Sequence, residues 1–231
     1  DNFTLNRTHA MTVLRAIEAA DLGLWIALPN GVRLDRLDVE LVEQLERAGV
    51  YSVAVGIDSG SPTLLKRMLR EITVEAMEQG IRLLREHSDI RVTGNFILGL
   101  PGESRADLVR TLLFARRTPL DRSYFGFFLP LPGSELFDEL RERGDLQGLD
   151  YSELSEMSQR APYSPEDISP RELRTWLVVA YAWFYLRPSI ISRLGRDLRG
   201  VEHIQAIGTR LVKQAPVDHG RRITRCHPAA A

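Results

Sequence analysis

The feature that most constrains the fold is a regular alternation of short apolar runs and amphipathic segments through the first 144 residues. Each apolar run ends in a loop rich in Gly, Pro, Ser or Asn, and apolar residues at helical spacing follow that loop. Strands that alternate with helices predict βαβ units, a parallel sheet and an α/β fold, and their nearly unbroken apolar character predicts that helices cover the sheet. The predicted strands are residues 25–28, 51–57, 90–98 and 124–129, and the predicted helices are 39–48, 73–87, 104–117 and 135–143, with a further helix beginning at Pro62.

Several helix ends in this region carry capping residues. Asp38 and Ser61 stand where N-caps are expected, because a short oxygen-bearing side chain can accept from the free N–H groups of a first helical turn. Pro62 fits a first helical position, and Gly49 fits the position after a helix end, where a left-handed backbone is common.

The rest of the chain has a different character. Residues 145–169 hold many Ser and Pro residues and are predicted to be a linker, residues 170–200 a C-terminal helical extension, and residues 201–231 a tail. The longest apolar run, Trp176 to Leu186, has eleven residues, whereas a helix needs about 20 to span a membrane. A basic run predicts a solvated helix face, with contact to an anionic membrane surface as the alternative. Its members are Arg187, Arg193, Arg196 and Arg199.

Charge and cysteine content exclude several classes of function. The chain has 30 Lys and Arg against 31 Asp and Glu, a formal net charge of −1, so we expect no nucleic-acid partner held by bulk charge. A single cysteine, Cys226, excludes an internal disulfide and any metal site that needs two cysteines from this chain. The low cysteine content is typical of a reducing compartment, so a cytoplasmic location is expected.

The loops after the predicted strands hold the residues with the most chemistry. In parallel α/β folds, binding sites gather at the carboxyl ends of the strands, where glycines allow a ligand to approach the backbone closely. Asp58 and Ser59 offer acceptors for a ribose diol, and Arg33 offers a bidentate partner for a carboxylate. Each loop taken alone is better explained as a turn, because Gly and Pro occur in turns everywhere.

Five segments taken together and in order are more specific. They are Asp1-Asn2-Phe3-Thr4, Arg33-Leu34-Asp35, Gly56 to Pro62, Ile97 to Glu103 and Phe128 to Leu136. This order resembles the radical S-adenosylmethionine (radical SAM) superfamily, and within it the subgroup that carries a cobalamin-binding domain upstream. The resemblance covers residues 1–144 well and residues 170–195 more loosely.

The resemblance implies a partial (β/α)₆ barrel, similar to a TIM barrel, with this chain supplying the second to sixth strands. In the superfamily, three cysteines of a CxxxCxxC loop hold a 4Fe-4S cluster, at which S-adenosylmethionine is reductively cleaved to start radical chemistry on a small-molecule substrate. The implied cofactors are S-adenosylmethionine and a 4Fe-4S cluster, with cobalamin as a further cofactor of the subgroup. The implied electron donor is a flavodoxin or ferredoxin, and the implied reaction is a methylation, a cyclisation or a rearrangement.

The resemblance also assigns cofactor contacts near the strand ends. Asp58 stands where the superfamily usually has Glu at the ribose end of the fourth strand, and it is one methylene shorter. Asn95, Ile97 and Gly99 match the region that packs on adenine, although their spacing follows ILGLPGE rather than GxIxGxxE.

Two further strand ends complete this set. Asp1 and Asn2 match the end of the second strand near the methionine part of the cofactor, while Phe128 and Pro130 on the sixth strand border adenine or substrate. The predicted cofactor-binding residues are Asp1, Asn2, Arg33, Asp58, Ser59, Ser61, Asn95, Ile97, Gly99, Phe128 and Pro130.

The sequence departs from the superfamily at the cluster. It contains no CxxxCxxC loop, and Cys226 cannot replace three cysteines. We therefore expect a fragment of a longer enzyme, inactive by itself, whose cluster-binding loop lies upstream and whose sheet has an open edge. Two alternatives stay open. One is a non-catalytic scaffold or SAM-like nucleotide-binding module without a cluster, and the other is an unrelated α/β barrel fragment that binds a phosphate at Ser59-Gly60-Ser61.

Overall fold

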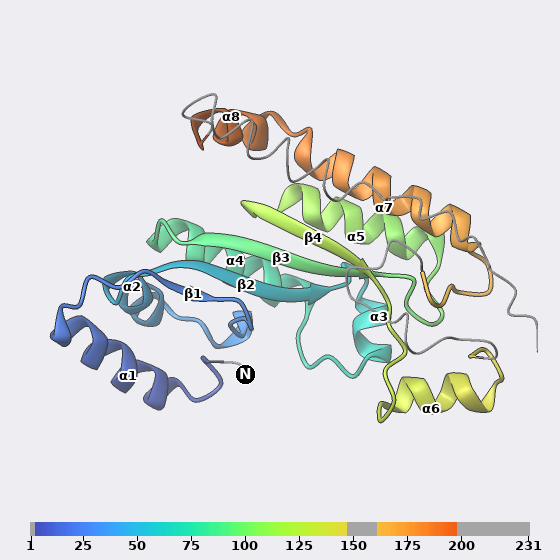
Figure 1. Ribbon diagram of the computed structural model, residues 1–231, viewed down its shortest axis with the longest axis horizontal. Helices are drawn as coiled ribbons and strands as arrows, with labels where there is room; N and C mark the ends of the chain where they lie inside the picture. The colour runs from blue at the N-terminus through green and yellow to red at the C-terminus, as the bar shows by residue number, and fades with distance from the viewer. Residues whose placement is uncertain (1–2, 147–160, 198–231) are drawn as a thin grey trace, which may run out of the picture. The chain divides into compact units, whose positions relative to one another are not determined.

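The computed structural model of the chain describes residues 3–146 and 161–197, with side chains up to residue 192 (Figure 1). The chain divides into a unit of Asp1–Ile190 and a unit of Ile191–Ala231. Asp1, Asn2 and Cys226 lie outside the described residues. The predicted domain boundaries stay a prediction.

A parallel four-stranded sheet forms the centre of the described part of the chain, as the alternation of strands and helices predicts. The strands lie in the order β1-β2-β3-β4, so each βα unit places the next strand beside the previous one. The α/β fold class and the helical C-terminal extension are therefore confirmed. The strands are β1 (Ile26–Leu28), β2 (Val50–Asp58), β3 (Arg91–Leu98) and β4 (Arg122–Phe127).

The helices begin largely where the sequence indicates. Asp38 accepts a hydrogen bond from the Leu41 N–H at the start of α2, and Gly49 has the predicted left-handed backbone, with φ of 88°. None of the helices that the structure describes is long and apolar enough to cross a membrane. The helices are α1 (Arg7–Ala20), the short 3₁₀ helix η1 (Leu34–Arg36), α2 (Val39–Arg47), α3 (Pro62–Arg67), α4 (Val74–His87), α5 (Arg105–Arg117), α6 (Glu135–Glu142), α7 (Pro170–Tyr185) and α8 (Pro188–Asp197).

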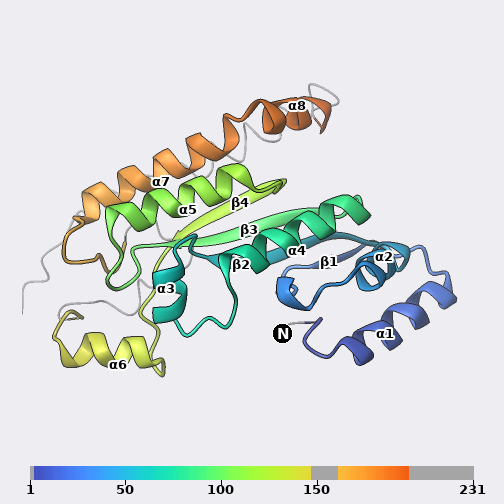
Figure 2. The same cartoon turned by 180° about the vertical axis from the view of Figure 1, so that it is seen from behind.

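One face of the sheet is covered by helices and carries the main core, with α4 and α5 running along it (Figures 1 and 2). Alternate residues of β2, namely Val53, Val55 and Ile57, point to this face and are fully buried. The same alternation buries Phe96 and Leu98 of β3. The helices contribute Leu41, Leu45, Met77, Ile81, Leu84, Leu108, Leu112 and Phe114 to this core.

The outer edge of β4 is covered by two tyrosine hydroxyls of α7. The Tyr181 hydroxyl accepts from the Phe125 N–H and donates to the Phe125 carbonyl, both at 3.2 Å. The Tyr185 hydroxyl does the same with Ser123, at 3.3 Å and 3.0 Å. These contacts satisfy the backbone groups that a further strand would otherwise use.

Arg187 lies in the interior, which corrects its predicted place on a solvated basic face. Its guanidinium donates to the carbonyls of Ala115, Arg116 and Thr118 at the end of α5 and stacks 4.0 Å over the ring of Phe184. The last carbonyls of a helix lack partners within the helix and carry partial negative charge, so a buried cation stabilises them. The rest of that run, Arg193, Arg196 and Arg199, lies outside the described side chains.

Two elements differ from the sequence prediction. Helix α1 was not predicted, although Asn6 caps it by accepting from the His9 N–H and its buried residues have helical spacing. Strand β4 begins two residues before the predicted start, because Arg122 already pairs with Thr93 of β3. The buried residues of α1 are Ala10, Met11 and Leu14.

Candidate functional site

No helix that the structure describes covers the second face of the sheet, called the open face below, and this face carries small and polar side chains. In-register partners of a parallel ladder point to the same face, so two levels can be followed from β2 to β4. They are Ala54, Thr93 and Arg122, then Gly56, Asn95 and Tyr124. Beyond them the ladder of β2 shifts register, so that Asp58 pairs with Phe96, while Ile97 pairs with Gly126.

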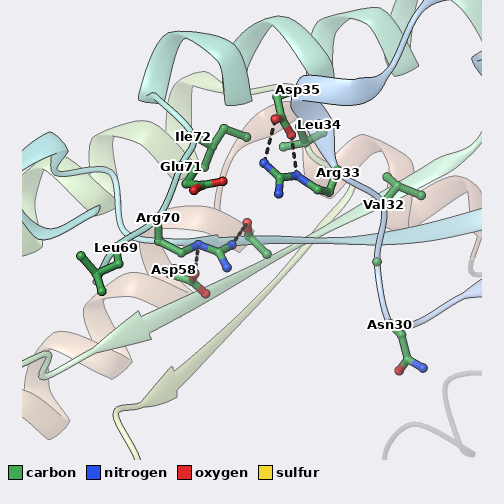
Figure 3. Close-up of a pocket in the computed structure, with 12 residues that line it drawn as sticks. Asn30, Val32, Arg33, Leu34, Asp35, Asp58, Leu69, Arg70, Glu71 and Ile72 are labelled. Atoms are coloured by element: carbon green, nitrogen blue, oxygen red, sulfur yellow. Dashed lines mark hydrogen bonds and ion pairs between the residues drawn. The ribbon is translucent and has the colours of Figure 1, made fainter. Parts of the chain in front are cut away.

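A cavity of about 400 Å³ opens at the carboxyl ends of β1 and β2 (Figure 3). Its volume lies within the range of roughly 300–1,000 Å³ that small-molecule sites occupy. Both signs of charge line it, because three carboxylates and two guanidinium groups share the wall. The lining residues are Asn30, Gly31, Val32, Arg33, Leu34, Asp35, Gly56, Asp58, Leu69, Arg70, Glu71 and Ile72.

Asp58 is the most constrained polar residue of this cavity. It ends β2 at a register irregularity and has a left-handed backbone with φ of 59°, which is uncommon outside glycine and tolerated by Asp. Its Oδ2 lies 2.9 Å from Nε of Arg70. Burial raises the pKa of the Asp58 carboxyl above its usual range, and the charge of Arg70 partly offsets that rise. Arg70 engages only Oδ2, so Oδ1 is left to accept from a ligand at the cavity wall.

Arg70 is a site residue that the sequence analysis missed. It comes from the loop between α3 and α4, and its guanidinium also donates to the Gly56 carbonyl at 3.2 Å (Figure 3). The loop is held in an unusual conformation, because Leu69 has φ of 54° and is 71% exposed. A left-handed backbone at a leucine is strained, and such strain is concentrated at binding sites and switch regions. No motif or spacing in the sequence places Arg70 at the end of β2.

Arg33 reaches the same cavity but is already occupied. Its Nε and Nη2 donate to the two oxygens of Asp35 at 2.9 Å and 2.8 Å. These hydrogen bonds hold the pKa of Asp35 below its ordinary value. Arg70 has the same two nitrogens engaged, by Asp58 and by the Gly56 carbonyl, so each guanidinium keeps Nη1 for a ligand carboxylate.

Ser59 and Ser61 are fully buried and point toward α5. The Ser59 hydroxyl lies 3.0 Å from the hydroxyl of Thr111, and the Ser61 hydroxyl donates to Asp107 at 2.6 Å. Ser61 thus stands at the N-cap position of α3 without capping it through its side chain. Both hydroxyls have partners within the chain, so they fasten the loop behind Asp58. Their engagement also leaves the phosphate-binding alternative without support.

The remaining predicted residues divide between two environments. Asn95 and Ile97 are half-buried on the open face, within two strands of Asp58. Gly99, with φ of 83°, faces the other way, because a Cβ there would lie 2.6 Å from Leu173 of α7. Phe128 is buried in a small second core, where its ring meets the ring of Tyr163 edge-on at 5.8 Å.

Pro130 is buried just after β4. Asp1 and Asn2 lie outside the described residues, so their predicted contact with the cofactor stays a prediction.

Glu103, inside the ILGLPGE segment, was also missed as a residue of interest. Its Oε2 accepts from the backbone N–H groups of Gly99 and Leu100 at 2.5 Å and 3.2 Å, whereas Oε1 is buried without a hydrogen-bond partner. Burial raises the pKa of Glu103 to about 8, and the neighbouring charge of Asp107 adds to the rise.

The donor set of the cavity fits S-adenosylmethionine. That molecule carries a ribose diol, an ammonium group and a sulfonium centre, which need acceptors, and a carboxylate, which needs donors. Asp58 and Glu71 offer acceptors and Arg70 offers donors. Gly56 leaves room for the Arg70 guanidinium at the cavity wall, since a Cβ there would lie 3.4 Å from Nη2 of Arg70.

Comparison with known proteins identifies the family that the sequence matches. A sequence model of the radical SAM superfamily matches residues 3–115. This part of the chain is a radical SAM superfamily domain. It is 26% identical over 196 residues to an uncharacterized methyltransferase of Pyrococcus horikoshii, a match that covers 84% of this chain and 41% of the relative. It is 30% identical to the cytidylyl-2-hydroxyethylphosphonate methyltransferase of Streptomyces wedmorensis, over 62% of this chain and 28% of the relative.

Solved structures of radical SAM enzymes share the fold. One is the methyltransferase TsrM of Kitasatospora setae, with cobalamin and a 4Fe-4S cluster bound, which matches with a TM-score of 0.54 and 22% identity over 76% of this chain and 36% of that one. Another is coproporphyrinogen III oxidase, HemN, of Escherichia coli, with a TM-score of 0.53 and 16% identity over 78% of this chain and 37% of that one. These relatives are consistent with the expected cobalamin-associated subgroup. The chain spans less than half the length of the curated relatives that it matches.

Proposed function

We propose that this chain provides the S-adenosylmethionine site of a radical SAM enzyme. The observation that carries the proposal is the charged cavity in which Asp58 and Arg70 face each other at the carboxyl end of the sheet. In this superfamily a reduced 4Fe-4S cluster supplies the electron that cleaves S-adenosylmethionine. The three cysteines that hold such a cluster would come from outside these 231 residues, since the chain has one cysteine.

The residues of the chain take distinct roles in this proposal. Asp58 accepts hydrogen bonds from the ribose hydroxyls, and Arg70 donates to the methionine carboxylate. Asn95 and Ile97 offer the open-face surface beside the adenine. Ser59 and Ser61 act behind the site, by holding the Asp58 loop against α5.

The wider activity follows the expectations from the resemblance. The reaction is a methylation, cyclisation or rearrangement of a small molecule, with electrons from a flavodoxin or ferredoxin and with cobalamin as a further cofactor. Support comes from curated relatives that include methyltransferases and an anaerobic magnesium-protoporphyrin IX monomethyl ester cyclase of Cereibacter sphaeroides, which is 28% identical over 66% of this chain and 24% of the relative.

The proposal predicts saturable binding of S-adenosylmethionine that depends on both charged residues. Replacing Asp58→Ala or Arg70→Ala removes charge-assisted hydrogen bonds, which contribute roughly 1.5–3 kcal/mol each, so the Kd should rise about tenfold or more. Isothermal titration calorimetry with S-adenosylmethionine measures this change.

Arg82→Ala serves as the matched control, because Arg82 lies on α4, is two-thirds exposed and pairs with Glu78 away from the cavity. The proposal is wrong if S-adenosylmethionine fails to bind, or if the control weakens binding as much as the two site variants. The single cysteine favours a second candidate, a module that binds S-adenosylmethionine without cluster chemistry. Anaerobic assay of the native protein for 5′-deoxyadenosine distinguishes the two.

A further inference from the structure

The open face beside the cavity carries a flat aromatic surface that the proposed cofactor contacts do not use. Tyr124 of β4 points to this face and is 36% exposed. Its ring lies along the strand over Gly126, where a Cβ would be 3.1 Å from Cε1 and 3.7 Å from Cζ. The glycine therefore allows the ring to lie against the sheet, so that its other side is turned away from the strand.

The neighbours of this ring limit what can lie on it. Asn95 pairs with Tyr124, and Ile97 pairs with Gly126, so an amide and an aliphatic side chain border the ring on β3. Across the sheet, Gly56 at the level of Asn95 adds no side chain. A planar group would contact the Tyr124 ring and Ile97 and could hydrogen-bond to the amide.

A positive charge lies on the amino-terminal side of Tyr124 along β4. Arg122 precedes Tyr124 by two residues on the same face, about 7 Å along the strand, and its side chain is exposed. No ion pair of Arg122 is present among the described residues. A guanidinium at that distance suits a carboxylate or phosphate attached to the planar group.

Position relates this surface to the cavity. Asp58 pairs with Phe96 of β3, and Phe96 pairs with Phe125, the residue after Tyr124, so the Tyr124 ring lies two strands, or about 10 Å, from Asp58. A molecule on the ring would lie next to a cofactor in the cavity without overlapping it.

We infer that Tyr124, with Gly126 and Arg122, binds the substrate of this enzyme, and that the substrate is a planar molecule carrying an anionic group. This assignment rests on the proposed function, because the open face is a substrate surface only if the cavity holds the cofactor. The planar part packs on the Tyr124 ring, and the anion pairs with Arg122.

The test uses three probes and amide chemical shifts from NMR of the whole chain. The probes are 2-naphthoate, which is planar and anionic, 2-naphthalenemethanol, which is planar and uncharged, and cyclohexanecarboxylate, which is anionic and not planar. We expect 2-naphthoate to bind most tightly and to shift the amides of Gly126, Asn95 and Ile97. Equal affinity for all three probes, or shifts confined to the helix-covered face, would overturn the inference.

Variants separate the two parts of the surface. Tyr124→Ala should weaken 2-naphthoate binding about tenfold, while Tyr124→Phe should bind as the wild type does. Gly126→Ala lifts the ring and should weaken binding without removing the tyrosine. Arg122→Gln should abolish the preference for 2-naphthoate over the alcohol. Tyr51→Ala, at an exposed tyrosine that packs on Trp25, is the matched control.

A loss in Tyr51→Ala as large as in Tyr124→Ala contradicts the inference. Binding of S-adenosylmethionine is titrated separately on the same samples. If 2-naphthoate binds as described and S-adenosylmethionine does not, the proposed function fails while the planar-anion surface stands. If S-adenosylmethionine binds and 2-naphthoate does not, only the inference fails.

Discussion

Glu103 illustrates how one buried side chain can dominate the pH response of a loop. Two backbone N–H groups serve one of its oxygens, and its other oxygen is buried without a partner. Burial favours the neutral acid, and the nearby charge of Asp107 acts in the same direction. The residue links the end of β3 to α5, so its protonation bears on the strand end that holds Asn95 and Ile97.

Replacing Glu103→Gln should remove a specific pH dependence of stability. The folded-state pKa is about 8 against an ordinary value of 4.5, so between these pH values the folded chain holds a proton that the unfolded chain has released. The free energy of unfolding of the wild type should therefore fall as pH rises through this window, by up to about 1.4 kcal/mol per pH unit. The glutamine variant lacks this titration. Urea unfolding at several pH values checks this, and parallel profiles of the two proteins would contradict it.

At the scale of elements, α7 acts as a cover for the sheet edge. Its tyrosines at positions 181 and 185 lie one helical turn apart, so their hydroxyls reach alternate residues of β4, which is the spacing of outward-pointing backbone groups. A helix thus provides hydrogen bonds that a strand usually provides.

Tyr181→Phe and Tyr185→Phe should each loosen this edge while keeping the ring contacts. Each change removes two hydrogen bonds to backbone, so the free energy of unfolding should fall by about 1–2 kcal/mol. Amide hydrogen exchange should accelerate at Phe125 in the first variant and at Ser123 in the second. Tyr51→Phe, at an exposed position, should change neither quantity. Unaltered exchange at both amides would refute the role of the hydroxyls.

At the same scale, sequence patterns predicted the elements better than their contacts. Apolar periodicity and capping residues located four strands and most helices, because these signals are local. Helix α1 was not predicted, although its N-cap Asn6 and the helical spacing of its buried residues are local signals. Strand β4 was misplaced by two residues because its start depends on pairing with β3.

The candidate site was predictable in part for a related reason. Asp58 follows directly from its strand-end loop, whereas Arg70 reaches the cavity through the turn of a different loop, and no spacing rule reveals that approach. The orientation of Ser59 and Ser61 toward α5 is likewise set by tertiary packing with Thr111 and Asp107. Residue type predicted the chemistry, and only the fold showed which side chains face the cavity.

At the scale of the whole molecule, the two outer strands differ. The outer side of β4 is satisfied by tyrosines, whereas β1 has an exposed Ala27 at its centre. The Ile26 N–H donates inward to the Gly49 carbonyl, and the ladder changes register between Ile26 and Ala27. Alternate residues of a strand bond to opposite sides, so we expect the Ala27 N–H to point outward. Exposed strand edges of this kind pair with other chains.

Ala27→Pro should therefore suppress self-association of this chain. The proline removes an outward donor without removing an inward ladder bond, and proline is tolerated on edge strands. Sedimentation velocity over a range of concentrations should show association of the wild type and a monomeric variant, with circular dichroism confirming that the variant is folded. Wild-type protein that stays monomeric at every concentration would rule this out.

The tyrosine cover of β4 has a consequence for how the molecule can be completed. Within the described residues, the sheet can grow only past β1, and the cavity lies at the carboxyl end of that strand. A polypeptide that adds a strand beside β1 would therefore lie next to the cavity, with β1, β2 and β3 between it and Tyr124 of β4. Extension of the sheet thus has one direction, which would place a macromolecular partner at the cavity and away from the aromatic surface.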